Sequence, residues 1–313
     1  MAKPILIDCD AGVDDALALI LAFRSPELSV KAITTVAGNV EVRKCTRNVY
    51  RILDLLQVKE RPEVAEGARR PLKAPLLVAS EVHGTDGLGG VSARLPSVGK
   101  IKPGEAVETI LQFCRRYGKR LTIVAVGPLT NLALALKADR RVLLGAGRIV
   151  SMGGAFHVPG NTGPVAEFNY YVDPDAAHAV LTSGVPVTVV PLDVTHQVVV
   201  MRSEMEYRAR RRASNVAQTV LDFTRDYMLY HRETQGFNGG YLHDPLAVGV
   251  AIDPTLVRTR KAHVDVEAAG MYTRGMTVAD FRKPAPRSEC TVDVAVKVDR
   301  DRFLRLFHGR LWM

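Results

Sequence analysis

The stretch that decides the fold is "ILIDCDAGVDDALALILAF", residues 5–23. A β-type apolar run and a helical apolar run flank Gly12, which permits a tight turn. Four aspartates stand within eight positions: Asp8, Asp10, Asp14 and Asp15. Strand periodicity predicts that the first two share a face at the strand end, and the last two fall in the first helical turn, where the dipole favours negative charge. We therefore expect all four carboxylates to converge on one crevice at the end of a strand.

The same alternation of strand and helix patterns continues along the chain. Short apolar runs rich in β-branched residues alternate with helical patterns: 29–38 then 42–56, 120–127 then 129–137, and 147–154, 176–184, 186–195. This order is typical of βαβ units, so we predict an α/β fold with a mostly parallel open sheet and helices on both faces. No segment resembles a linker, so we expect a single domain over residues 1–313. Residues 80–104 and 202–232 are interpreted as insertions on this scaffold.

Polar residues follow several of the predicted strands, and ligands of open α/β sheets bind outside the carboxyl ends of strands. One run ends at Asn39, and another ends at Val126, after which Thr130 or Asn131 can cap a helix. Further candidates follow later runs: Met152, Asn161, Glu167, Asn169, His243 and Asp244. The His-Asp pair before a helix is open to two readings, a local cap or a catalytic unit.

A crevice with several carboxylates needs a compensating charge. Two carboxylates about 4 Å apart repel by roughly 4 kcal/mol at an effective dielectric constant of about 20. Oxygen ligands without histidine pairs or thiolates favour Ca²⁺ or Mg²⁺ over zinc. An EF-hand is excluded, because its glycine and terminal glutamate positions, counted from Asp8, hold Val13 and Leu19. The sequence therefore predicts a site for a divalent metal ion.

Eight segments, in this order, carry a resemblance to a known family: "DCDAGVDDALAL" (8–19), "ITTVAGN" (33–39), "VAVGPLTNLA" (124–133), "SMGGAF" (151–156), "GNTGPVAEFNYYVDPDAAH" (160–178), "LDVTHQ" (192–197), "LHDPLAV" (242–248) and "GMTVADFR" (275–282). They are similar to the inosine-uridine-preferring nucleoside hydrolases over nearly the whole chain. Such enzymes hydrolyse the N-glycosidic bond of ribonucleosides to ribose and free base, using a tightly bound Ca²⁺. The resemblance implies their Rossmann-like fold and a role in purine or pyrimidine salvage.

The resemblance also implies roles for the strand-end residues. Calcium would be held by the side chains of Asp10, Asp15 and Asp244 and by the backbone carbonyl of Val126, with Asp8 supporting the site from behind. The ribose hydroxyls would be held by the following residues: Asp14, Asn39, Met152, Asn161, Glu167 and Asn169. Carboxylates, amides and a hard cation are the partners that vicinal hydroxyls require.

The implied mechanism divides the proton transfers between two residues. Asp10 would take a proton from a calcium-bound water below the anomeric carbon. Departure of the base makes the sugar an oxocarbenium-like cation, as in other glycoside hydrolyses. His243 would be the general acid for the departing base, with a pKa that can straddle neutrality.

Two segments are candidates for binding the substrate's base. The glycine-rich "EVHGTDGLGG", residues 81–90, carries His83 and is read as a mobile lid or as a plain surface loop. A second lid-like segment holds the candidate base contacts: Tyr227, His231, Gln235, Phe237 and Tyr241. The purine-specific branch of the family sandwiches its base between tryptophans, whereas the only tryptophan here is Trp312. That branch is therefore not expected, and the preferred base is left open.

Composition bounds the setting of the protein. The start lacks a signal-peptide pattern, and no apolar run is long enough to cross a membrane. The four cysteines show no zinc or CxxC spacing, which indicates free thiols in a reducing compartment, so we expect a cytoplasmic protein. The family forms dimers and tetramers, and we expect a homodimer or a homotetramer without a feature that decides between them.

The formal charge of +9 raises the question of nucleic-acid binding. Much of the clustered excess lies between Arg208 and Arg212, and no RRM, KH, zinc-finger or helix-turn-helix signature accompanies it. We interpret this cluster as a solvated basic face and expect no nucleic-acid partner. "GAGRIV", residues 145–150, partly matches a dinucleotide motif but precedes a strand, so we discard it.

Two alternatives to a nucleoside hydrolase are considered. A strand ending in DxD also opens the haloacid-dehalogenase-type phosphatases, but Asp14 and Asp15 come too early for the late acidic pair of that family. A non-catalytic protein that binds nucleoside or calcium would share the metal ligands. Asp10 and His243 discriminate against this second alternative, because both are present.

Overall fold

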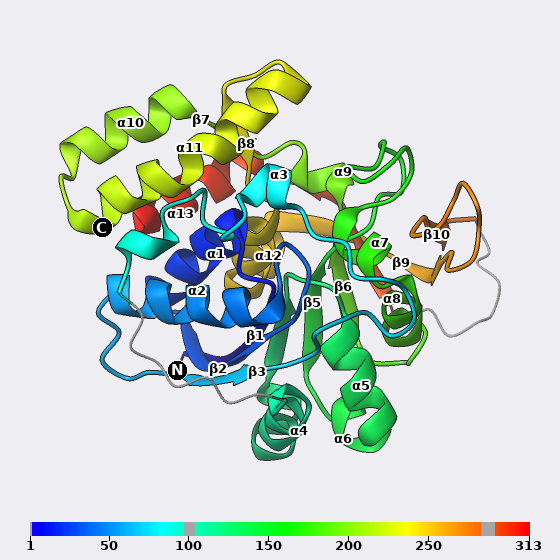
Figure 1. Ribbon diagram of the computed structural model, residues 1–313. Coiled ribbons are helices and arrows are strands. Elements are labelled where there is room, and N and C mark those ends of the chain that lie inside the picture. Colours follow the sequence, from blue (N-terminus) through cyan, green and yellow to red (C-terminus); the bar gives the residue numbers. More distant parts are fainter. Residues whose placement is uncertain (1, 97–103, 283–291) are drawn as a thin grey trace.

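The computed structural model describes residues 2–96, 104–282 and 292–313 (Figure 1). A nine-stranded sheet runs through the molecule in the order β10-β9-β11-β6-β5-β4-β1-β2-β3. Its strands are β1 (Lys3–Cys9), β2 (Leu28–Thr35), β3 (Glu63–Glu66), β4 (Thr122–Ala125), β5 (Arg148–Met152), β6 (Val187–Val190), β9 (Val257–Val266), β10 (Thr277–Asp280) and β11 (Val292–Val298). In this order, all neighbouring strands between β11 and β3 pair in parallel. The strand β9 pairs antiparallel with β11 on one side and with β10 on the other. The predicted mostly parallel α/β sheet is confirmed.

Helices cover both faces of this sheet (Figure 1). One face carries α1 (Val13–Phe23), α2 (Val42–Leu55), α11 (Asn215–Gln235), α12 (His243–Ile252) and α13 (Arg300–Leu311). The other carries α4 (Ala106–Tyr117), α5 (Thr130–Ala138), α6 (Arg140–Leu144) and α8 (Pro174–Leu181). Strand alternation separates the two cores: Ile5 and Ile7 of β1 belong to the first and Leu6 to the second.

Shorter elements lie around the carboxyl ends of the strands. They are α3 (Ser80–His83), α7 (Phe168–Val172), α9 (Leu192–Thr195), α10 (Arg202–Arg211), and the two-stranded sheet of β7 (Val199–Met201) with β8 (Gly239–Tyr241). The run 186–195 is therefore not one strand: β6 ends at Val190 and, after Pro191, the chain turns into α9. In the described ranges, no helix is both long and apolar enough to cross a membrane.

The order of the strands locates the site. From β1 the chain goes outward to β2 and β3, and it then returns to the other side of β1 to form β4. The carboxyl ends of β1 and β4 thus flank the point where the winding direction changes, which is where open α/β sheets bind ligands. The residues after β1 and β4 are those that carry the predicted site. That a single domain spans residues 1–313 stays a prediction.

Candidate active site

A cavity of about 460 Å³ opens at this switch point. Most of the predicted site residues line it: Asp14, Asn39, His83, Val126, Met152, Asn161, Glu167, Asn169, Tyr227, His231, Gln235, Tyr241, His243 and Asp244. Asp10 and Asp15 lie buried beneath it, with no exposed surface. The chain therefore brings together groups that are up to about 230 positions apart (Asp14 and Asp244) by placing them at neighbouring strand and helix ends.

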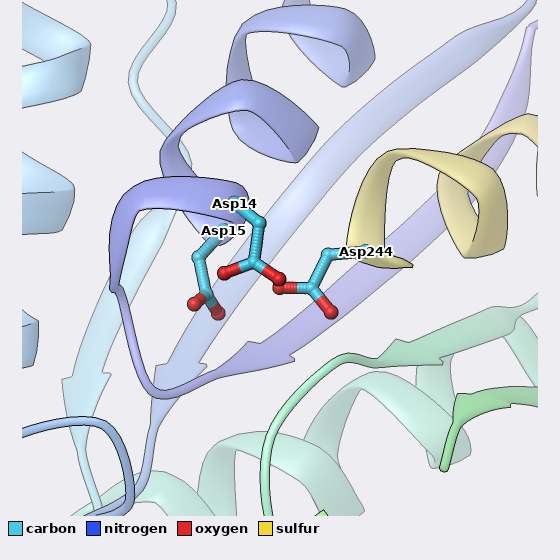
Figure 2. A group of neighbouring side chains, drawn as sticks. All are labelled: Asp14, Asp15 and Asp244. Atoms are coloured by element: carbon cyan, nitrogen blue, oxygen red, sulfur yellow. The ribbon is translucent and has the colours of Figure 1, made fainter. Parts of the chain in front are cut away.

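Three carboxylates form the centre of the site. Asp14 and Asp15 stand in the first turn of α1 and Asp244 in the first turn of α12, and these two helices pack against each other. One carboxylate oxygen from each of the three lies within 4.8 Å of the others. Figure 2 shows the carboxyl groups of Asp14 and Asp244 facing one another, with Asp15 beside them.

Burial dominates the electrostatics of this group. Burial, and then the charge of Asp15, raises the pKa of Asp14 to about 8, and burial raises the pKa of Asp15 to about 6. The pKa of Asp244 is raised well above its ordinary value by burial and then by the charge of Asp14. Asp15 is shifted least because its carboxylate accepts backbone N–H groups from Asp10, at 3.2 Å, and Gly12, at 2.8 Å. Holding these carboxylates ionised together requires a compensating cation.

Asp10 lies in a cradle formed by two glycines. Its Oδ2 accepts the backbone N–H of Asn39 at 2.7 Å. A Cβ on Gly38 would stand 2.1 Å from this oxygen, and a Cβ on Gly127 would stand 2.9 Å from Oδ1. Burial and the charge of Asp15 raise the pKa of Asp10 well above its ordinary value. The backbone at positions 38 and 127 thus approaches Asp10 more closely than a residue with a Cβ would allow.

The residues present fit a bound divalent cation. Asp10 Oδ1 and Asp14 Oδ1 are buried and have no hydrogen-bond partner among the described residues. An unsatisfied buried polar group costs about 1–3 kcal/mol, and more if it is charged. An oxygen-only donor set suits Ca²⁺ or Mg²⁺. The close group of three includes Asp14, which the family resemblance assigned to the sugar, and Asp10 is not a member of this group.

Asp8 does not join the other carboxylates, so the expected convergence of all four is wrong. Its Oδ1 accepts hydrogen bonds from Thr34 Oγ1 at 2.5 Å and from Asn131 Nδ2 at 2.8 Å, on the α5 side of the sheet. Strand alternation places the side chains of Asp8 and Leu6 on the same face of the sheet. Because β1 ends at Cys9, Asp10 lies outside the strand and does not follow this alternation. Asp8 still touches the site through its backbone, because its carbonyl accepts the N–H of Val126 at 2.8 Å.

The predicted sugar-binding residues meet at the ends of β4 and β5. Asn169 Nδ2 donates to the carbonyls of Val126 and Met152, both at 3.3 Å. Glu167 caps α7 by accepting the backbone N–H groups of Asn169 and Tyr170, at 2.9 and 3.2 Å, and burial raises its pKa to about 7. Each of these groups is therefore held rigidly by the backbone.

Asn161 lies at the rim of the cavity rather than in its depth. Its side chain is exposed, and its Oδ1 accepts the backbone N–H of Phe168 at 2.9 Å. This hydrogen bond closes the loop between β5 and α7 over one side of the cavity.

His243 is buried at the start of α12, where its Nδ1 lies 2.7 Å from Thr195 Oγ1. Burial lowers its pKa well below 6.5, and the rings of His196, His231 and His83 lower it further. The expectation of a pKa that straddles neutrality is wrong, because the ring sits in an enclosed cluster of imidazoles. His243 is a neutral imidazole at neutral pH.

The glycine-rich segment 81–90 is tied to α2 by Asn48, whose Nδ2 donates to the carbonyl of Asp86 at 2.9 Å. The carboxylate of Asp86 accepts the backbone N–H groups of Leu88, Gly90 and Ser92, each at 2.9 Å, which lowers its pKa. His83 is buried, and burial lowers its pKa to about 3. Glu81, Val82 and His83 of this segment line the cavity, and whether the segment is a mobile lid or a plain surface loop stays open.

His83 and His231 present opposite tautomers to the cavity. The backbone N–H of Val13 donates to His83 Nδ1 at 3.1 Å, so the proton of the neutral ring sits on Nε2. His231 Nδ1 lies 2.8 Å from the carbonyl oxygen of Tyr227, which only accepts, so Nδ1 carries the proton and Nε2 carries a lone pair. One ring therefore offers a donor and the other an acceptor.

Of the two aromatic candidates for the base pocket on the second lid-like segment that remain, one lines the cavity and the other does not. Tyr241 lines the cavity and its ring centroid lies 4.7 Å from that of His196. Phe237 is not among the lining residues and instead packs behind Tyr241, with ring centroids 5.1 Å apart. His196 and Phe168 line the cavity but were not predicted as site residues, although both lie in segments that carry the family resemblance.

Comparisons with known proteins agree with this geometry. The family model described as "Inosine-uridine preferring nucleoside hydrolase" matches residues 5–305. The pyrimidine-specific ribonucleoside hydrolase RihA of Enterobacter sp. (strain 638) is 43% identical over 312 residues, covering 99% of this chain and 98% of that protein. The protein of the same name from Salmonella enteritidis PT4 is 44% identical over 319 residues, covering 99% of each chain.

Solved structures of the same class superpose over the whole chain. A plant nucleoside hydrolase, PpNRh1, is 35% identical, with a TM-score of 0.92, over 100% of this chain and 99% of that chain. The purine-preferring ribonucleoside hydrolase from Gardnerella vaginalis is 38% identical, with a TM-score of 0.90, over 99% and 98% of the two chains. These matches leave no place for the phosphatase or the non-catalytic alternative. The chain belongs to the inosine-uridine preferring nucleoside hydrolase family and is a ribonucleoside hydrolase.

Proposed function

We propose that the chain cleaves the N-glycosidic bond of ribonucleosides in a calcium-dependent reaction centred on its buried carboxylates. The observation that carries this proposal is the pair of unpartnered buried oxygens, Asp10 Oδ1 and Asp14 Oδ1, at a cavity lined by amides and carboxylates. The cation would be held by the side chains of Asp10, Asp15 and Asp244 and the carbonyl of Val126. When bound, Ca²⁺ would supply the positive charge that offsets the cluster and acidifies a water.

Asp10 is proposed as the acceptor of the proton from the attacking water. Its Oδ2 is fixed by the Asn39 N–H, so its orientation is set before substrate binds, while Oδ1 has no partner among the described residues. A carboxylate with one anchored and one unpartnered oxygen is well suited to take a proton without moving. Pre-organisation of this kind reduces the entropic cost of reaching the transition state.

The sugar is proposed to bind to Asp14, Asn39, Glu167 and Asn169 in the depth of the cavity, with Asn161 at its rim. Because Glu167 and Asn169 are tied to backbone groups, they would hold the ribose in one position as its ring becomes cationic. A site built to bind a hydroxyl discriminates strongly against an analogue that lacks it, since its buried polar groups are left unpaired.

His243 is proposed to assist the departing base as a neutral hydrogen-bond donor. Donation of the Thr195 hydroxyl proton to Nδ1 would leave the ring proton on Nε2 and direct it away from Thr195. A neutral imidazole can stabilise developing negative charge on a leaving group without first becoming a cation. Thr195 is then a positioning residue, and His243 is the group that touches the base.

Pyrimidine ribonucleosides are proposed as the preferred substrates. Two relatives at 43–44% identity are named pyrimidine-specific. The donor of His83 and the acceptor of His231 match the carbonyl oxygens and the imide N–H of uracil. Trp312, the only tryptophan, does not line this cavity, so a tryptophan sandwich for a purine is missing from the described residues.

A reducing-sugar assay on a panel of nucleosides tests the proposal. We expect ribose release from uridine and cytidine, about tenfold slower release from inosine and adenosine, and release from 2′-deoxyuridine that is slower by about 100-fold or more. Faster release from purine nucleosides would overturn the base preference alone. Absence of reducing sugar from every ribonucleoside, in protein that is folded and supplied with Ca²⁺, would overturn the function.

A further inference from the structure

A second cavity, of about 410 Å³, lies between α10 and the end of α13. It is lined by Tyr207, Arg208, Arg211, Arg212, His308, Gly309, Trp312 and Met313. It shares no lining residue with the active-site cavity. The Arg208–Arg212 cluster, interpreted from the sequence as a solvated basic face, thus forms one wall of a cavity of ligand-binding size.

The arginines of this wall carry more positive charge than their neighbours neutralise. Arg208 contacts Glu204 Oε1 at 3.0 and 3.2 Å. Arg211 Nη1 donates to the Tyr207 hydroxyl at 2.8 Å and lies over its ring, 5.5 Å from the centroid. Neither contact neutralises Arg211, and the guanidinium of Arg212 has no hydrogen bond or ion pair with any part of the chain that the structure describes.

A buried histidine, His308, also lines this cavity. Its side chain is only 4% exposed. The indole N–H of Trp312 donates to Nδ1 at 3.2 Å, so the proton of the neutral ring sits on Nε2. Nε2 lies 3.1 Å from Glu204 Oε1, so this carboxylate is the charged group that faces His308. The donors of the cavity without a carboxylate partner among the described residues are therefore the guanidinium groups of Arg211 and Arg212, which favour a ligand that supplies acceptor oxygens.

We propose that this cavity binds a small phosphate monoester, such as a sugar phosphate or a nucleoside monophosphate. Arginine is the side chain best matched to phosphate, because its planar fork donates two parallel hydrogen bonds. A cavity of about 410 Å³ is far larger than a phosphate group alone needs, so the ligand carries an organic part. The apolar walls for that part are the Trp312 ring and the Met313 side chain.

The single tryptophan makes the site directly observable. Trp312 is the only tryptophan of the chain and lines this cavity, so its fluorescence reports on this site and not on the active site. The protein is titrated with uridine 5′-monophosphate, ribose 5-phosphate, inorganic phosphate and uridine. We expect a saturable change with both monoesters, binding weaker by about tenfold for inorganic phosphate, and no change with uridine.

The double variant Arg211→Ala/Arg212→Ala is expected to weaken monoester binding by about tenfold or more, because it removes the two guanidinium groups proposed to bind the phosphate. A tenfold loss of affinity corresponds to about 1.4 kcal/mol. The matched control is Arg116→Ala/Arg120→Ala. It removes the same charge from two exposed arginines that lie over the ring of Tyr117, on α4 and the turn after it. This control should bind monoesters like the parent.

Several results would overturn the proposal. These are no saturable change with either monoester, equal weakening by both double variants, and inorganic phosphate binding as tightly as the monoesters. A response to a single-stranded RNA oligonucleotide without a response to monoesters would assign the surface to nucleic acid instead. None of these outcomes bears on ribose release at the active site, so the two proposals fail independently.

Discussion

A Cβ on Gly38 would stand 2.1 Å from Oδ2 of Asp10. Real side chains do not approach an oxygen so closely, so position 38 has no room for any residue but glycine while Asp10 keeps its place. The same loop supplies the Asn39 N–H that holds Asp10. The orientation of the proposed catalytic carboxylate is thus determined by the absence of a side chain on the neighbouring loop.

Gly38→Ala should displace Asp10 and lower kcat/KM by about 100-fold, since a misplacement of about 1 Å at a reacting group costs about that much. Steady-state ribose release from uridine measures the effect, and circular dichroism checks the fold. Gly147→Ala is the matched control: its Cβ would meet the Lys119 carbonyl at 2.2 Å, at the opposite end of the sheet. That control should melt at a lower temperature but keep its activity per folded molecule, and equal activity losses in both variants would contradict the role of Gly38.

Thr195→Val should remove the hydrogen bond to His243 Nδ1 and lower kcat for uridine by at least about tenfold, because a positioned proton donor contributes about 100-fold or more. Thr195→Ser keeps the hydroxyl and should restore most of the rate. A nitrophenyl riboside, whose leaving group needs no donor, should be cleaved by all three proteins at similar rates. An equal loss for both substrates would show that Thr195 is only structural.

Asn131→Ala should destabilise the protein by about 2 kcal/mol, the cost of leaving buried polar groups unpaired. Its side chain donates to Asp8 Oδ1 at 2.8 Å and to the Thr35 carbonyl at 2.9 Å, and it accepts the N–H of Ala68. Urea denaturation measures the change. Gln218→Ala, which removes an exposed amide from α11, should stay within about 0.5 kcal/mol of the parent. Similar effects of the two substitutions would contradict the bridging role of Asn131.

His308 should make stability depend on pH. Burial lowers its pKa from 6.5 to about 4, so below pH 6.5 the unfolded chain binds the proton before the folded protein does. The contribution of neutral His308 to the unfolding free energy is fully present above pH 6.5 and is lost as the pH falls toward 4. Between pH 7.5 and 4.5 the unfolding free energy of His308→Gln should fall less steeply with decreasing pH than that of the parent. The difference between the two slopes should correspond to the uptake of up to about one proton on unfolding. Identical slopes would mean that His308 is protonated equally in both states.

The sequence predicted the sheet, the first helix and most of the cavity because these follow from local periodicity and from groups at strand ends. Asp14 and Asp15 stand in the first turn of α1 as expected, whereas α12 begins at His243, so the His-Asp pair lies inside the first turn of that helix and not before it. The antiparallel strands β9 and β10 were not predicted, since an edge pairing depends on partners far along the chain. His196 was missed for a similar reason, because only the folded chain brings it against Tyr241 and His243.

The expected capping by Thr130 or Asn131 is wrong for a tertiary reason. Neither side chain caps α5. Thr130 donates to Asp173 at 2.6 Å, and Asn131 donates to Asp8, which lies 123 positions earlier. Buried acceptors elsewhere in the fold compete successfully with the local helix end, and sequence spacing does not reveal them.

Metal removal tests the central claim, the dependence of ribose release on a cation at the carboxylate cluster. The protein is stripped with a chelator, its metal content is verified by mass spectrometry, and activity on uridine is followed as Ca²⁺ is returned. We predict an inactive stripped protein, recovery at about one Ca²⁺ per chain, and no recovery for Asp244→Asn. Full activity of protein verified to be free of metal would contradict the account.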